Sequence, residues 1–126
     1  MFLLCVEWHK SGDYFAVGDY GEFEDAENKL IQFWNIAGEK LLETKGSVAE
    51  YRNIRWSPDG KWQASANDAL RIWDEDGKLI NQSESSDDYL WGIDWNSDGS
   101  KIITTSSQGV ITLWDKEVNL IRQLEY

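Results

Sequence analysis

The residues that could perform chemistry in this chain are few. The 126 residues include one cysteine, Cys5, and one histidine, His9. Nucleophilic catalysis needs a nucleophile, a base and a group that orients the base, and no such combination is found in the sequence. A single histidine also leaves little material for a histidine-based metal site. We therefore expect a protein that is not an enzyme and that has no cofactor and no bound metal.

Two acidic segments are the remaining candidates for chemistry, because carboxylates can hold a cation. Residues 19–27 hold five acids in nine positions, but they lack the alternating acids and the closing glutamate of a calcium loop. A solvated loop is expected there, with cation binding or contact with a basic partner as the alternatives, and Glu24 and Asp25 are the first carboxylates to test. The second segment, Asp74-Glu75-Asp76-Gly77, is expected to be a hairpin turn.

The composition of the chain excludes several classes of protein. Twelve Lys and Arg against 23 Asp and Glu give a formal net charge of −11, whereas nucleic acids and anionic membranes attract basic surfaces. The chain has eight tryptophans, and disordered chains are poor in such groups. No apolar run approaches the roughly 18 residues of a membrane span, and residues 1–6 are too short and lack the basic start of a signal peptide. We expect a folded cytoplasmic protein that binds neither nucleic acid nor membrane.

The elements that must position these residues follow from an internal repeat. One sequence phrase occurs at residues 6–12, 54–60 and 93–99. It consists of an aliphatic residue, a charged residue, a tryptophan and a turn that ends in glycine. A second phrase, which ends in Trp-Asn or Trp-Asp, occurs at 31–35, 70–74 and 110–115. Because a fixed internal period is the signature of a repeat architecture, we divide the chain into three units at about 2–50, 51–88 and 89–126. The first unit is longer because residues are inserted before Trp34.

Within each unit the apolar residues alternate with a period of two, which is typical of strands rather than helices. Pro58-Asp59-Gly60 predicts a tight turn, because proline fixes φ and glycine accepts positive φ. No stretch shows a helical stripe with caps. We therefore predict an all-β protein built from four-stranded antiparallel modules. Besides the inner strand, the expected strands are 62–66, 69–73 and 78–82 in the second unit and 101–106, 110–114 and 119–124 in the third.

The motifs within these units resemble those of the WD-repeat family. They are Ser-Pro-Asp-Gly-Lys at 57–61, Trp-Asp at 73–74 and 114–115, and Asp-Gly-Lys-Leu at 76–79, and the resemblance covers essentially the whole chain. It implies that each unit is one four-stranded blade of a β-propeller. The chain departs from the family pattern at Trp34-Asn35 and lacks the Gly-His dipeptide before the inner strands. The family's polar tetrad of His, Asp, Ser or Thr and Trp is therefore not expected to form in full.

The eight tryptophans separate into two groups. Six are repeat-equivalent and are expected to pack between blades, whereas Trp62 and Trp91 have no tryptophan counterpart in the other units. Trp91 lies where one blade crosses over to the next, and the resemblance implies that this crossover opens on the face where partners dock. Tyr, Trp and Arg dominate the hot spots of interfaces. The predicted partner site consists of Tyr51, Arg52, Asn67, Asp68, Tyr89, Trp91 and Gln108.

The predicted function is a non-catalytic scaffold that binds a protein or a peptide. The alternative is a ligand- or glycan-binding propeller that uses exposed aromatic residues and carboxylates. A flat surface around Trp91 favours the scaffold, and a deep pocket with converging polar groups favours ligand binding. For each residue of the predicted site, an ordinary polar loop or a half-buried aromatic side chain is the competing interpretation.

Three blades are too few for a propeller, because rings close with about four to eight. An open arc exposes two apolar blade faces, and large apolar patches mark interfaces. We expect a homodimer in which blade three of each copy packs head to tail against blade one of the other and closes a six-blade ring. Blades from another polypeptide or from a longer chain are the alternative. Val6 and Ile93 are expected in the packed layers, so a charge there would dissociate the dimer. Closure would set Asp94 near Glu7 of the other copy, a like-charge pair that costs about a few tenths of a kcal/mol, which is too little to forbid closure.

Overall fold

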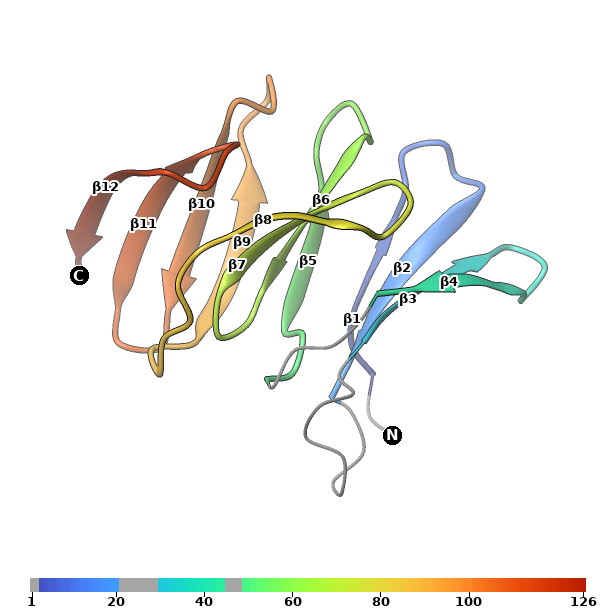
Figure 1. Ribbon diagram of the computed structural model, residues 1–126, viewed down its shortest axis with the longest axis horizontal. Helices are drawn as coiled ribbons and strands as arrows, with labels where there is room; N and C mark the ends of the chain where they lie inside the picture. Colours follow the sequence, from blue (N-terminus) through green and yellow to red (C-terminus); the bar gives the residue numbers. More distant parts are fainter. Residues whose placement is uncertain (1–2, 21–29, 45–48) are drawn as a thin grey trace.

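The computed structural model describes residues 3–20, 30–44 and 49–126, which form three four-stranded antiparallel sheets (Figure 1). The predicted all-β class and the four-stranded blades are confirmed. In each sheet the spatial order of the strands follows the order in the chain. The first sheet holds β1 (Leu3–Trp8), β2 (Tyr14–Asp19), β3 (Ile31–Asn35) and β4 (Lys40–Glu43). The second holds β5 (Asn53–Trp56), β6 (Trp62–Ala66), β7 (Leu70–Asp74) and β8 (Leu79–Gln82). The third holds β9 (Leu90–Trp95), β10 (Lys101–Ser106), β11 (Val110–Asp115) and β12 (Leu120–Glu125).

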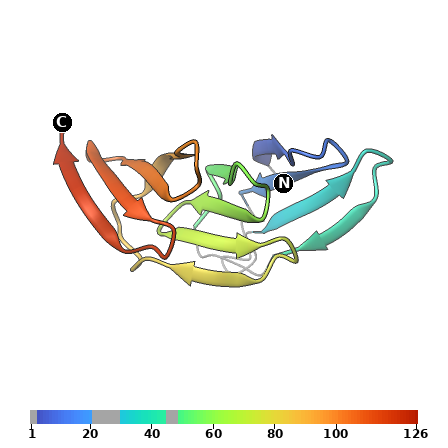
Figure 2. The ribbon, with the colours of Figure 1, turned by 90° about the horizontal axis from the view of Figure 1, so that it is seen from above.

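The three sheets stand side by side in an arc (Figure 2). The first strand of each sheet, β1, β5 or β9, lies on the concave side, and these inner strands contact one another in turn. The last strand of each sheet lies on the convex side. The arc therefore has two terminal faces, one on the first sheet and one on the third.

Each interior interface joins two different faces of neighbouring sheets. We call the face that carries the inner-strand tryptophan the leading face, and the opposite face the trailing face. Ile54, Trp56 and Trp73 on the leading face of the second sheet pack against Ala16 and Phe33 on the trailing face of the first. The interface between the second and third sheets repeats this arrangement with Ala64, Ala66, Leu70, Ile72, Ile93, Trp95 and Ile102. Burial of these faces is the main stabilising contribution, at about 25 cal/mol per Å² of apolar surface.

Polar contacts add register to the two interior interfaces. The Glu7 carboxylate accepts a hydrogen bond from the backbone N–H of Trp56 at 2.7 Å. At the next interface the indole Nε1–H of Trp95 donates to the carbonyl oxygen of Arg55 at 3.0 Å. In both, the residue that precedes one inner-strand tryptophan accepts a hydrogen bond from the tryptophan of the following sheet. These bonds fix how far one blade slides along the next.

A second set of indole bonds holds each sheet together. Trp73 donates to the hydroxyl of Ser65, and Trp114 to that of Thr104, each at 2.9 Å. In the first sheet Val17 occupies the position of these hydroxyl residues, and Trp34 donates instead to a side chain on its own strand, Gln32, at 3.1 Å. The indole–hydroxyl part of the family's tetrad is thus present in two sheets and absent from the described part of the first.

The expected packing of Ile93 is confirmed, whereas that of Val6 depends on a second copy and stays a prediction; a charge at Ile93, however, does not test dimerisation. Ile93 is 5% exposed because it packs within the chain, between the second and third sheets. A charge there would be buried without a partner and would disrupt the chain itself. Val6 is 64% exposed on the leading face of the first sheet. Trp8, on the same face, is 56% exposed, so the expectation that all six repeat-equivalent tryptophans pack between blades is not met within this chain.

The buried position of Ile93 predicts a large loss of stability on truncation. Ile93→Ala should lower the free energy of unfolding by about 2–4 kcal/mol, because it removes apolar contacts and leaves a cavity between two sheets. Ile80→Ala, on the exposed outer strand β8, should cost less than about 1 kcal/mol. Urea denaturation followed by tryptophan fluorescence measures both values, and equal losses would contradict this interface.

Glu7 predicts a pH dependence of stability. Burial raises the pKa of its carboxyl above the ordinary value of 4.5, and Asp94 adds to the rise, whereas the Trp56 N–H and Arg55 oppose it. The folded chain therefore binds this proton more tightly than the unfolded chain, so the stabilisation is present at acid pH and is lost as the pH rises through the raised pKa. The stability of the wild type relative to Glu7→Gln should fall in urea titrations as the pH rises above the ordinary glutamate pKa of 4.5.

The matched control for Glu7 is Asp59, whose pKa shifts in the opposite direction. The Ser57 hydroxyl and the Lys61 N–H donate to its carboxylate and hold its pKa below the ordinary value of 3.8. The stability of the wild type relative to Asp59→Asn should therefore rise with pH, and that rise should begin at a lower pH than the fall at Glu7. Trends of the same sign for both variants would contradict the assignment.

Candidate functional site

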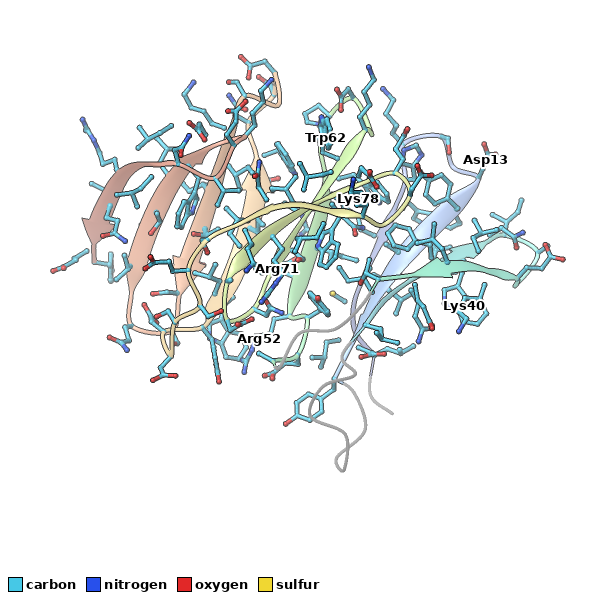
Figure 3. All side chains as sticks on the ribbon, in the orientation of Figure 1. Asp13, Lys40, Arg52, Trp62, Arg71 and Lys78 are labelled. Atoms are coloured by element: carbon cyan, nitrogen blue, oxygen red, sulfur yellow. The ribbon has the colours of Figure 1, made fainter. Side chains whose placement is uncertain are left out.

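The candidate site lies at the edge of the arc where the inner strands begin. The chain reaches β5 and β9 there by crossing over from the outer strand of the preceding sheet. We call this the crossover edge. Figure 3 places Arg52 at this edge, below the start of β5, and Trp62 at the opposite edge of the same sheet. The crossover edge thus presents residues from neighbouring blades next to one another.

Arg52 is the centre of the site. Its guanidinium carbon lies 3.8 Å from the centroid of the Trp91 ring and 5.6 Å from that of Tyr89. The same guanidinium forms an ion pair with Glu50. Trp91 is 53% exposed, so Arg52 covers only part of the indole. A cation over an aromatic face stabilises by about 0.5–1 kcal/mol at an exposed site, and it holds both side chains in fixed positions.

A hollow of about 430 Å³ opens beside this stack. Its lining includes Leu4 on β1, Tyr20 just after β2, Glu50 and Arg52 in the segment before β5, and Trp91 on β9. Leu4, Arg52 and Trp91 each lie two residues before the aliphatic residue of the repeated phrase, so they are repeat-equivalent. The sequence analysis did not select Leu4, Tyr20 or Glu50, although the repeat register was a signal that could have identified Leu4. The site therefore draws on all three blades.

Three residues of the predicted site are buried, and their assignment to a binding surface is wrong. Tyr51 is fully buried in the interface between the first and second sheets, with its ring edge-on to Trp73 at 6.4 Å, and burial raises its pKa to about 12. Asn67 and Asp68 are buried in the turn between β6 and β7. Arg71 donates to Asn67 Oδ1 at 2.5 Å and to Asp68 Oδ1 at 2.8 Å. This turn closes on the Arg71 side chain, so its polar groups stabilise the blade.

Gln108 is exposed, but it belongs to a different part of the surface. Its backbone N–H donates to Asp88 Oδ1 at 2.9 Å, and the hydroxyl of Ser107 donates to the same oxygen at 2.8 Å. Asp88 therefore ties the turn between β10 and β11 to the crossover that precedes β9. Gln108 is not among the described residues that line the hollow. Of the seven predicted residues, the structure brings Arg52, Tyr89 and Trp91 together.

Cys5 and His9 have structural contacts. The half-buried Cys5 thiol donates to the carbonyl oxygen of Tyr51 at 3.3 Å, and burial raises its pKa to about 11. His9 Nε2 lies 2.9 Å from the carbonyl oxygen of Gly60, and its ring stacks on Tyr14 at 4.3 Å. Both residues therefore join the first sheet to the second. A thiol with a raised pKa is a poor nucleophile at neutral pH.

The structure describes the second acidic segment in full and the first only in part. Glu24 and Asp25, the first carboxylates to test, lie outside the described residues. Asp74-Glu75-Asp76-Gly77 forms the predicted hairpin turn, in which Gly77 has a φ of +74°. In residues 3–20, 30–44 and 49–126, no group of three His, Cys, Asp or Glu is placed to hold a metal ion. Within the same residues, no helix is long and apolar enough to cross a membrane.

Comparison with known proteins identifies relatives of this architecture. The model of the family described as WD domain, G-beta repeat matches residues 39–74 and 77–115. The small ribosomal subunit protein RACK1y of Oryza sativa subsp. japonica is 27% identical over 64% of the chain, and the putative BTB/POZ domain and WD-repeat protein R61 of Acanthamoeba polyphaga mimivirus is 31% identical over 81%. The SIR4-interacting protein SIF2 of Saccharomyces cerevisiae is 31% identical over 49%. The chain covers 27%, 21% and 12% of these relatives, respectively.

Solved structures share the fold. The crystal structure of RRP9 WD40 repeats superposes with a TM-score of 0.85 over 98% of the chain, at 17% identity, and the chain covers 38% of that structure. The structure of U3-55K gives the same TM-score and identity and is covered to 39%. These structures establish the blade architecture of the chain.

The buried environment of Cys5 predicts slow alkylation. A pKa of about 11, against 9.0 for an ordinary thiol, leaves about a hundredfold less thiolate at neutral pH. Iodoacetamide should therefore modify the native chain at least tenfold more slowly than the chain in urea, and Cys5 is the only cysteine, so intact mass reports its modification alone. Equal rates in the two states would contradict the structural role of this thiol.

Proposed function

This chain belongs to the WD-repeat family, and on that premise we propose that it is a non-catalytic interaction scaffold that binds a protein or a peptide at the crossover edge. The observation that carries the proposal is the stack of Arg52 on the half-exposed Trp91, with Tyr89 beside it. The relative SIF2 is named as an interacting protein, which supports an interaction role for its repeats. The family premise supports the class of function, and the stack supports its location.

The chemistry of the stack suits the recognition of a peptide. Tyr, Trp and Arg are the residues most enriched in interface hot spots. Tyr and Trp bury a large area while losing little side-chain entropy, and Arg offers several hydrogen-bond donors in a planar group. Glu50 and Trp91 already hold the Arg52 guanidinium in place, so a partner does not have to order it. Leu4 and Tyr20 extend the surface across the first blade. A partner segment lying here contacts all three blades.

A second candidate function rests on the volume of the hollow. At about 430 Å³ it lies within the range of small-molecule sites, which is about 300–1,000 Å³. The half-exposed Trp91 and the Glu50 carboxylate in its lining suit a glycan or another polar ligand. The charged groups of the lining, however, are Glu50 and Arg52, which pair with each other rather than converging on the empty space. This pairing favours recognition of a peptide over binding of a small polar ligand.

We further propose that other blades cover the two terminal faces of the arc. The leading face of the first sheet and the trailing face of the third are exposed here, whereas their counterparts within the chain pack against neighbouring sheets. The covering blades belong to a second copy of the chain, to another polypeptide or to further repeats of a longer chain. A closed ring surrounds the crossover site with further blades and enlarges the surface offered to a partner.

Peptides selected from a random phage-displayed library against the wild-type chain test the crossover site. Their dissociation constants should rise at least tenfold for Trp91→Ala and for Arg52→Ala, because each substitution removes a hot-spot side chain worth about 1.4 kcal/mol or more. Lys61→Ala, an exposed cation on the turn between β5 and β6, is the matched control and should bind unchanged. Peptides that bind equally well to all three variants would overturn the site. A soluble glycan panel that binds the wild type but not Trp91→Ala would instead favour the second candidate.

A further inference from the structure

The leading face of the first sheet is an exposed apolar surface. Trp8 and Phe15 stack edge to face with their ring centroids 5.2 Å apart, and Trp8 is 56% exposed. A hollow of about 350 Å³ lies on the same sheet, and nearly all of its surface is apolar. It is lined by Leu3, Phe15, Val17, Gln32 and Trp34. An apolar surface of this kind on a water-facing sheet marks an interface.

The trailing face of the third sheet is the second exposed surface. Ile103 is 44% exposed at its centre, paired with Leu113 on β11, and Leu124 on β12 is also exposed. Asp94, which pairs with Ile103, is exposed on the inner strand of the same face. Aliphatic side chains therefore cover the middle of this face, and a carboxylate marks its inner margin.

These two faces are the two halves of the interface that the chain already forms twice. Trp8 occupies the position of Trp56 and Trp95, which pack against the preceding sheet. Ile103 occupies the position of Ala16 and Ala64, which pack against the following sheet. Each copy of the chain therefore carries both halves of one further interface, on opposite ends of the arc. The two halves cannot meet within one copy, because the other sheets lie between them.

The inner margins carry polar groups that can pair, although a seam also brings the like charges of Asp94 and Glu7 near each other. In the interior interfaces the residue before each inner-strand tryptophan, Glu7 or Arg55, accepts a hydrogen bond from the next sheet's tryptophan. At the end of the arc that position is Asp94, which no described sheet follows and whose Oδ1 accepts a hydrogen bond from the backbone N–H of Trp95 at 2.9 Å. At the start of the arc, no described sheet precedes Trp8. The Asp94 carboxylate, which can accept further hydrogen bonds, and Trp8 thus lie at opposite ends of the arc.

We propose that a second copy of this chain covers both faces, so that two head-to-tail seams between Trp8 and the surface around Ile103 and Asp94 close a six-blade ring. This inference rests on the proposed function, in which other blades cover the two terminal faces of the arc, and it assigns those blades to a second copy of the chain. Two copies related by a two-fold axis form two identical seams, and no leading or trailing face stays exposed. Six blades lie within the range in which propellers close. Asp94 then contacts the Trp8 N–H groups of the partner copy, as Glu7 and Arg55 contact the tryptophans that follow them.

Size-exclusion chromatography with light scattering tests the seams through two variants that each damage one face. The wild type should have twice the chain mass of 14.6 kDa at micromolar concentration. Trp8→Glu and Ile103→Glu should each be monomeric, because every seam in either homodimer then contains one damaged face. Both residues are exposed within the chain, so far-UV circular dichroism should be unchanged. Trp91→Ala, the variant that removes the crossover site, should keep the wild-type mass.

Mixing the two monomeric variants gives the sharpest result. A mixed pair has one seam made of the undamaged face of each variant, so the dimer mass should return, with weaker association than in the wild type. A wild-type mass of 14.6 kDa, a dimer that survives Ile103→Glu, or variants that stay monomeric when mixed would each overturn the proposal. None of these outcomes bears on peptide binding at Arg52 and Trp91, so the two proposals fail separately.

Discussion

The structure depends on one repeated contact, in which the inner-strand tryptophan of a sheet packs against the trailing face of the sheet before it. A four-stranded sheet has two faces, and burying both requires a neighbour on each side. Trp56 and Trp95 make this contact with apolar surface and, at the margin, with hydrogen bonds between blades. The arc, the crossover edge and the exposed terminal faces all follow from repeating this contact.

Most of the fold could be predicted from the sequence because the same physical constraints recur in each unit. The alternation around Trp56 and the Pro58-Asp59-Gly60 turn predict strands and a hairpin, and the structure has β5, β6 and that turn at these positions. Trp8 shows the limit of this reasoning. Its repeat position predicted packing, but packing also needs a preceding sheet, and periodicity within one unit says nothing about what lies next to it.

The candidate site was predicted less well, because exposure depends on tertiary contacts. Arg52 and Tyr51 are adjacent in the sequence, yet alternation along the chain sends the Tyr51 ring into the interface and the Arg52 guanidinium onto Trp91. Asp68 was expected in an open loop, but Arg71, three residues later, draws it into a buried ion pair. Glu50 was missed because its pairing with Arg52 depends on the shape of the crossover rather than on a motif.

The leading face of the first sheet carries more apolar side chains than that of the second sheet. On its leading face Phe15 and Val17 occupy the positions at which the second sheet has Gln63 and Ser65. Ser65 accepts a bond from Trp73 inside its own sheet, whereas Val17 accepts none and adds apolar surface. Polar side chains at these positions would stabilise a face that is exposed to water, because exposed apolar area is unfavourable. At these two positions the terminal leading face is more apolar than the leading face of the second sheet, which is the change expected of a surface that another blade covers.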